Sequence, residues 1–140
     1  MRRGEADPLD TLGGDLVELT VPAEPAYLAV LRTATAGLAA RLSFSLDEIE
    51  DLRIAVDEAC AMLLTLPAPA GPQPATLTCR FRVLSDGLAV TVSAPTVARA
   101  ALPAEQSFAW HVLTAHAAEV TGTAEDGQAA INLVKRRPRR

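Results

Sequence analysis

Two adjacent carboxylic acids, Asp57 and Glu58, are the residues of this chain with the clearest potential for chemistry. A carboxylate can act as a general base, and its surroundings decide whether its pKa suits that task. The simpler interpretation is a pair of solvated acids on the polar face of a helix. The residue types alone leave both roles open for Glu58, whereas Asp57 is expected to be exposed.

The histidines and cysteines do not form a metal-binding pattern. His111 and His116 are five residues apart on one predicted helix, which is neither of the spacings that place two ligands on the same face. Cys60 and Cys79 are remote from them in the sequence. Two cysteines in a chain of this length make no disulfide framework, and both are expected to be small buried hydrophobes. The sequence therefore predicts no metal site.

The segment Ser45–Leu66 is predicted to be the helix that positions the acid pair. Ser45 is a natural N-cap, and Glu48 three residues later completes a capping-box pattern. Prolines 67 and 69 then end the helix. Acids crowd its first turns, where the helix dipole favours them: Asp47, Glu48, Glu50 and Asp51. Apolar residues recur at three- and four-residue steps and define one buried face: Ile49, Leu52, Val56, Ala59 and Leu63.

The other elements follow from alternation, helical periodicity and turn residues. Two further helices are predicted over Pro25–Arg41 and Glu105–Val120, the second with Phe108, Val112, Leu113 and Ala117 on its inner stripe. Asp-Gly pairs between alternating runs predict hairpin turns. The five predicted strands are Leu16–Val21, Ala75–Leu84, Leu88–Ser93, Val120–Ala124 and Ala129–Val134.

This order of elements predicts an α+β fold. The expected architecture is a two-layer sandwich, in which a mostly antiparallel sheet is covered on one face by about three helices. Residues 1–14 are expected to be a disordered leader, residues 15–137 the single folded domain, and residues 138–140 the end of a basic tail.

Charge and hydrophobicity narrow the class of protein. The net charge is −4, but five of the 13 Lys and Arg residues lie in the last six positions, so residues 1–134 carry a net charge of −9. An acidic body is unsuited to direct nucleic-acid binding and favours a basic protein partner. No apolar run approaches the roughly 18 residues of a membrane span, and no signal peptide is evident. We therefore expect a cytoplasmic protein.

Three segments resemble the anti-sigma regulatory factors of the RsbW/SpoIIAB type, small protein kinases on the GHKL (Bergerat) ATP-binding fold. Residues 51–60 (DLRIAVDEAC) are similar to the family's N-box helix almost residue for residue. Residues 107–113 (SFAWHVL) stand where the family carries its second glycine box, and the third segment is the C-terminal hairpin ending in a basic Lys-Arg-Arg run. The resemblance covers residues 15–137 and is closest to an actinobacterial branch.

The resemblance implies a nucleotide site and locates its altered motifs. In active members the N box supplies a catalytic Glu and, four residues later, an Asn that ligates Mg²⁺; here these positions are Glu58 and Met62. A thioether is a poor ligand for that hard cation. The Asp-x-Gly box that binds adenine is replaced by a run beginning at Ser93, Ser-Ala-Pro, and the second glycine box by one beginning at Ser107, Ser-Phe-Ala-Trp.

These replacements predict a retained fold with lost kinase chemistry. Phe108 and Trp110 are expected to fill space that a nucleotide needs, with Trp110 packed in the core. The lid, residues 96–105, is too short and too poor in glycine to wrap a triphosphate. Glu58 is then a relic of the catalytic base, and no cofactor is expected. ATP and Mg²⁺ would be required only if the kinase chemistry survives.

The function implied by the resemblance is an anti-sigma factor that sequesters an alternative sigma factor. An anti-anti-sigma (STAS) antagonist would release it, and the active form would be a homodimer. The acids Asp47, Glu48, Asp51 and Asp57 are expected to provide a docking face for a basic sigma segment. The alternative is an active serine/threonine kinase that phosphorylates the antagonist with ATP. A sensor of another small ligand and a free-standing module without a sigma partner also stay open.

Overall fold

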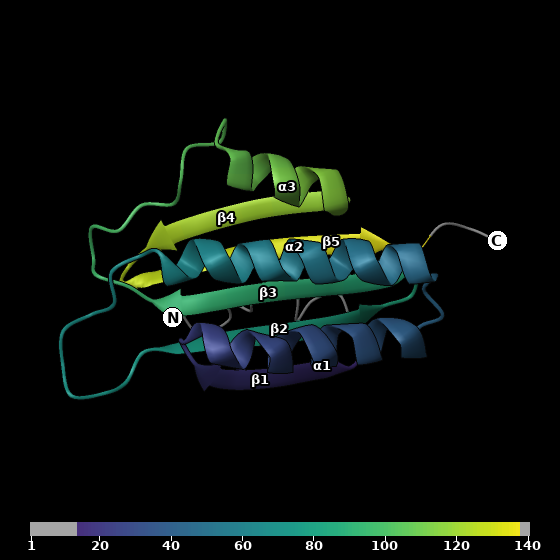
Figure 1. Cartoon of the computed structure of the whole chain (residues 1–140), viewed down its shortest axis with the longest axis horizontal. Helices are drawn as coiled ribbons and strands as arrows, with labels where there is room; N and C mark the ends of the chain where they lie inside the picture. The colour runs from purple at the N-terminus through teal and green to yellow at the C-terminus, as the bar shows by residue number, and fades with distance from the viewer. Residues whose placement is uncertain (1–13, 138–140) are drawn as a thin grey trace.

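In the computed structural model, which describes residues 14–137, three helices lie in a row across one face of a five-stranded sheet (Figure 1). This confirms the predicted α+β two-layer sandwich. The leader predicted over residues 1–14, apart from Gly14, and the tail at 138–140 lie outside the described residues. The elements in chain order are β1 (Leu16–Pro22), the 3-10 turn η2 (Pro25–Tyr27), α1 (Leu28–Arg41), α2 (Leu46–Leu64), β2 (Thr76–Leu84), β3 (Gly87–Pro95), α3 (Phe108–His116), β4 (Glu119–Glu125) and β5 (Gln128–Arg136).

All neighbouring strands of the sheet run antiparallel. Their spatial order is β1-β2-β3-β5-β4, so β5 lies between β3 and β4, and β1 and β4 form the two edges. Alternation then assigns side chains to faces: Leu77, Cys79 and Phe81 of β2 are fully buried on the helix side, while the intervening residues lie on the helix-free side. The hydrophobic core is the space between the sheet and the helices.

Helix α2 lies across the middle of the sheet, over β3 and β5 (Figure 1). Its start is the predicted capping box: the Ser45 N–H donates to Oε1 of Glu48 at 2.6 Å, and the Glu48 N–H donates to the Ser45 hydroxyl at 3.2 Å. Of the predicted apolar stripe, Leu52, Val56, Ala59 and Leu63 are buried as expected, whereas Ile49 is only partly buried. Three further residues of the helix are buried, and they are Ala55, Cys60 and Met62. Amphipathic periodicity and a terminal cap therefore determine this element locally.

Both predicted Asp-Gly hairpins are present, for different reasons. Asp126 and Gly127 have φ angles of 55° and 76°, the left-handed backbone that a tight β4–β5 turn requires. At Gly87, in the β2–β3 turn, a Cβ atom would lie 2.3 Å from the backbone oxygen of Lys135 on β5. Glycine is needed there because two strands approach each other closely.

The structure corrects three expectations about helices. The first predicted helix begins with the 3-10 turn η2, so its α-helical part starts at Leu28. The third is shorter than predicted and ends at His116, because the chain becomes extended at Ala117 and enters β4. Phe108 was expected on its inner stripe but is 79% exposed, whereas Leu113 is fully buried. Helix α3 packs mainly against α2 and lies over the β4 edge of the sheet, and Phe108 in its first turn is left in solvent (Figure 1).

None of the helices within residues 14–137 is both long enough and apolar enough to cross a membrane.

The capping box of α2 makes the first testable prediction. Replacing Ser45 with Ala removes the acceptor for the Glu48 N–H, so we expect a loss of about 1 kcal/mol in the free energy of unfolding. Urea denaturation followed by circular dichroism measures this change. Ser85→Ala, at an exposed turn position, is the matched control and should leave stability nearly unchanged. An equal loss in both variants would contradict a specific role for the cap.

Candidate functional site

Glu58 and Met62 lie one turn apart on α2, in different environments. Glu58 is half-buried, whereas Met62 is only 3% exposed and belongs to the hydrophobic core. The Met62 side chain therefore fills space between α2 and its neighbours. A buried thioether offers no oxygen ligand to Mg²⁺, which binds through oxygen atoms. At this position the geometry favours packing over cation binding.

Ser93 lies on the opposite side of the sheet from Met62. It is paired in register with Thr78 and Ala130, while its neighbours Val92 and Ala94 are buried on the helix side. Ser93 lines an open hollow of about 460 Å³ on the helix-free face. The structure thus does not bring Ser93 together with Glu58 and Met62, because successive residues of a strand point to opposite faces.

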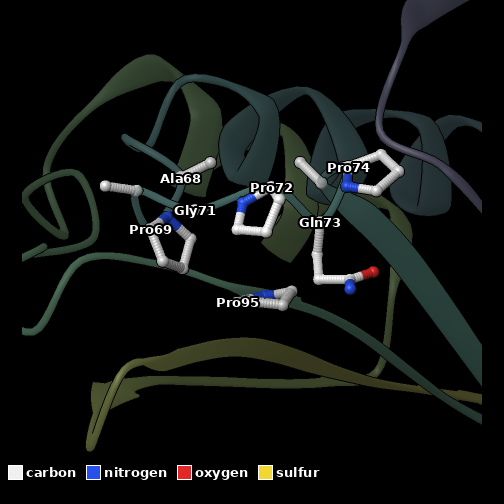
Figure 2. Close-up of a pocket in the computed structure, with 9 residues that line it drawn as sticks. Ala68, Pro69, Gly71, Pro72, Gln73, Pro74 and Pro95 are labelled. Atoms are coloured by element: carbon white, nitrogen blue, oxygen red, sulfur yellow. The ribbon is translucent and has the colours of Figure 1, made fainter.

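The end of β3 borders a small apolar cavity formed by the proline-rich segment 68–75. Figure 2 shows the rings of Pro69, Pro72 and Pro74 arranged around it, with Pro95 of β3 opposite them. The cavity has a volume of about 200 Å³, and Gln73 provides the single polar side chain among its lining residues. Such a lining offers neither an acid to read a base nor cations for phosphates. It suits an apolar group.

Ser107 and Trp110 mark the region of the altered second glycine box. Ser107 is the N-cap of α3, but its hydroxyl makes no capping hydrogen bond and is buried without a partner among the described residues. The indole N–H of Trp110 donates to the Pro103 carbonyl at 2.6 Å. Its ring lies directly over Gly122 of β4, since a Cβ atom there would be 2.7 Å from Cη2. Trp110 therefore ties the connection between β3 and α3 to the sheet.

This arrangement revises the expected roles of the two aromatic residues. Trp110 is half-buried and packs against the core, as predicted. Phe108 was expected to fill nucleotide space and does not, because its side chain is largely in solvent. The contact of Trp110 with Pro103 and Gly122 had no signal in the sequence, since it joins three separate segments.

The four acids proposed as a docking face point in different directions. Asp47 is exposed in the first turn of α2, and Glu48 caps the same helix. Asp51 pairs with Lys135 of β5 at 3.1 Å, and Asp57 pairs with Arg32 of α1 at 2.8 Å. The expectation that Asp57 is exposed holds only in part, because 43% of its side-chain surface is accessible and the carboxylate is ion-paired. The two ion pairs flank α2 on opposite sides.

Cys60 of α2 and Cys79 of β2 are buried, as predicted, and their side chains lie next to each other in the core. A hydrogen bond with Cys79, together with burial, raises the pKa of the Cys60 thiol well above its ordinary value of 9.0. Cys60 is therefore a neutral thiol at physiological pH. Among the described residues, no group of three or more His, Cys, Asp or Glu side chains could hold a metal ion.

Comparisons with known proteins find relatives of one kind. The chain is 39% identical over 79 residues to the serine-protein kinase RsbW of Bacillus subtilis (strain 168) and 35% identical over the same length to RsbW of Bacillus licheniformis. Each match covers 56% of this chain and 49% of the relative, so the chain matches about half the length of these curated proteins. No protein-family model matches the chain.

A solved structure shows the same fold. The crystal structure of the RsbU and RsbW domains of Rv1364c from Mycobacterium tuberculosis superposes with a TM-score of 0.68 at 14% identity, covering 90% of this chain and 34% of that one. Together, the sequence matches show that this chain has homologues among RsbW serine-protein kinases, and the superposition shows that it shares the architecture of that crystal structure.

Met62, where the resemblance implies a ligand for Mg²⁺, is a buried thioether, and the end of β3, where it implies an adenine-binding acid, meets a proline-lined cavity. The connection before α3, where it implies a lid, is held by Trp110. Glu58 alone keeps the residue type and partial exposure of a general base.

The buried thiols yield the second prediction. Cys60 and Cys79 should not react with DTNB at pH 8 in the native protein, and both should react after unfolding in urea. Because the folded state raises the pKa of Cys60, this residue's contribution to stability is complete below the unfolded thiol's pKa of 9.0 and is lost as the pH rises above it. Cys60→Ala should remove this pH dependence. Rapid labelling of the native protein would show that the thiols are accessible.

Proposed function

We propose that this chain is an anti-sigma factor that acts by binding its partners and has lost phosphotransfer. It sequesters an alternative sigma factor in the cytoplasm as a homodimer, and an anti-anti-sigma (STAS) protein releases the sigma factor by competing for the dimer. Direct contact with nucleic acid is not part of this function. The observation that carries the proposal is the burial of Met62 in the core, four residues after Glu58.

Two further features support loss of the nucleotide. Pro95 stands at the end of β3, where it removes a backbone N–H and borders an apolar cavity. The hydrogen bond from Trp110 to Pro103 holds the connection before α3 against the sheet. A triphosphate needs backbone amides, a metal and cations around it. Glu58 is then a relic, and Ser93 and Ser107 are degenerate positions without a nucleotide role.

The second candidate function is an active ATP-dependent serine/threonine kinase that phosphorylates its antagonist. Two observations favour it: the matched relatives are named serine-protein kinases, and Glu58 is retained in a half-buried position. In this case ATP and Mg²⁺ would be required. The two candidates differ in a property that can be measured directly, which is nucleotide affinity.

The sigma-binding surface is proposed to include the acids of α2. Asp47 is exposed and can steer a basic segment toward the protein. Asp51 and Asp57 already pair with Lys135 and Arg32, so a partner's cation would replace these intramolecular partners. Such an exchange contributes less affinity than the pairing of an unoccupied acid. Apolar contacts must then supply most of the binding free energy.

The decisive experiment is isothermal titration with ATP and Mg²⁺ up to millimolar concentrations. We expect no saturable heat, with Bacillus subtilis RsbW measured in parallel as the positive control. A saturable curve followed by phosphate transfer to a STAS protein would instead establish the kinase. Co-purification of the tagged protein with a sigma factor tests the binding function independently, and failure to retain any sigma factor would contradict it.

The third prediction concerns position 62, where active members of the family carry the asparagine that ligates Mg²⁺. Met62→Asn should not produce phosphotransfer, because the residues at the end of β3 and before α3 remain altered. It should also destabilise the fold by about 2–5 kcal/mol, since it places an amide in the core. Glu58→Gln, at a half-buried position, is the companion variant and should leave folding and partner binding unchanged. Measurable phosphotransfer by folded Met62→Asn would contradict the proposed loss of the site.

A further inference from the structure

Strand β4 is an edge of the sheet, and its pairing capacity is used on one side only. Glu119–Glu125 pairs with β5 through seven consecutive positions without a bulge. No other strand of the described chain pairs with it. Backbone N–H and C=O groups of alternate residues therefore face outward. The sequence EVTGTAE contains no proline or lysine, the residues that commonly protect such an edge.

A cavity of about 530 Å³ opens beside this edge, between β4 and α3. The indole of Trp110 forms one wall, and its position is held by the hydrogen bond to the Pro103 carbonyl. Val120 and Gly122 contribute the strand side, and Glu105 stands at the rim. A large apolar wall with one acid beside it suits an apolar side chain that has a cation nearby.

The charges around β4 select the type of partner. Glu119 and Glu125 lie at the two ends of the strand, both exposed, and Glu105 adds a third acid near the cavity. Arg136 of β5 is the cation that pairs with Glu119, at 2.9 Å. A second copy paired antiparallel about Gly122 would place Glu119 opposite Glu125 of the other chain. Like charges in directly opposed positions are destabilising, so a basic strand fits this edge better than the same strand does.

We propose that the outer edge of β4 is a docking site for an extended basic segment of another protein. The segment adds as a further strand to the sheet, places an apolar side chain in the Trp110 cavity, and directs lysine or arginine side chains toward Glu105 and Glu125. Backbone hydrogen bonds provide affinity, and the cavity and the acids provide selectivity. The cavity shares Trp110 with the altered second glycine box, but the proposal requires no nucleotide and stands whether or not the protein is a kinase.

Trp110 is the single tryptophan of the chain, so its fluorescence reports on the cavity. The probe is a nine-residue acetylated peptide with lysine at positions 2, 3, 7 and 8, leucine at its centre and threonine elsewhere. Lysines 3 and 7 share the face of the leucine and can reach Glu105 beside the cavity, whereas lysines 2 and 8 lie on the opposite face, as Glu125 does. We expect a saturable change of Trp110 emission on titration with the peptide, weakened by added salt.

Charge-reversal variants test the site itself. Glu125→Lys and Glu105→Lys should each weaken peptide binding about tenfold, because each replaces an attraction with a repulsion. Glu24→Lys makes the same change in net charge at an exposed position between β1 and α1 and should leave binding unaltered. All three changes are at exposed positions, and circular dichroism verifies that the variants fold.

Specific results would overturn the proposal. An absent or non-saturable response, equal binding of a peptide with glutamate in place of lysine, or equal weakening by Glu24→Lys would each do so. A peptide that is N-methylated at the alternate residues whose N–H groups would face β4 cannot donate hydrogen bonds to that strand and should not bind. If it binds as well as the parent peptide, no strand is added. Loss of peptide binding as the protein self-associates at higher concentration would assign the edge to a second copy instead.

Discussion

Helix α2 buries seven residues in the hydrophobic core, and this packing limits which of its side chains can bind a ligand. Its apolar face lies over β3 and β5, which are neighbouring strands in the interior of the sheet. Met62 belongs to this buried face, one turn beyond Glu58. A position can pack in a dry core or ligate a hydrated cation, but the same side chain cannot do both. The packing of α2 therefore bears directly on whether a nucleotide can be used.

Ion pairs connect α2 to both of its neighbours. Asp57 pairs with Arg32 of α1 on one side, and Asp51 pairs with Lys135 of β5 on the other. Each pair is partly exposed, so it contributes little to stability, on the order of 0–1 kcal/mol. Each ion pair has a greater effect on partner binding, because an acid that the sequence suggests for binding a partner's cation is already paired within the chain. The exposed acids that a basic partner can reach are instead Asp47 and the acids around β4.

Trp110 links three separate parts of the chain. Its indole joins α3, the connection at Pro103 and the glycine of β4. The residue that closes the region above the sheet also forms the wall of the cavity beside the β4 edge. In the two proposals made above, this one side chain both restricts the nucleotide region and shapes the docking site. This connects the proposed loss of nucleotide binding with the proposed docking of an extended segment.

Local features of the sequence determined the elements and the fold class. The Ser45–Glu48 box, the alternation in β2 and the Asp-Gly turns act over a few residues, so their signals can be read in order along the chain. The resemblance to RsbW-type proteins located Glu58 and Met62 on one helix. Helical periodicity gave a wrong prediction for Phe108 of α3, which is exposed because the helix lies at the edge of the sheet.

Tertiary structure alone decided which residues meet. The pairing of Asp57 with Arg32, the placement of Ser93 on the helix-free face and the packing of Trp110 over Gly122 join residues far apart in the chain. The position of β5 between β3 and β4 is likewise a property of the tertiary structure, and it leaves β4 at the edge of the sheet. Such contacts depend on the order of strands and the placement of helices over them. Neither property has a local signal, because both are set by how the whole core packs.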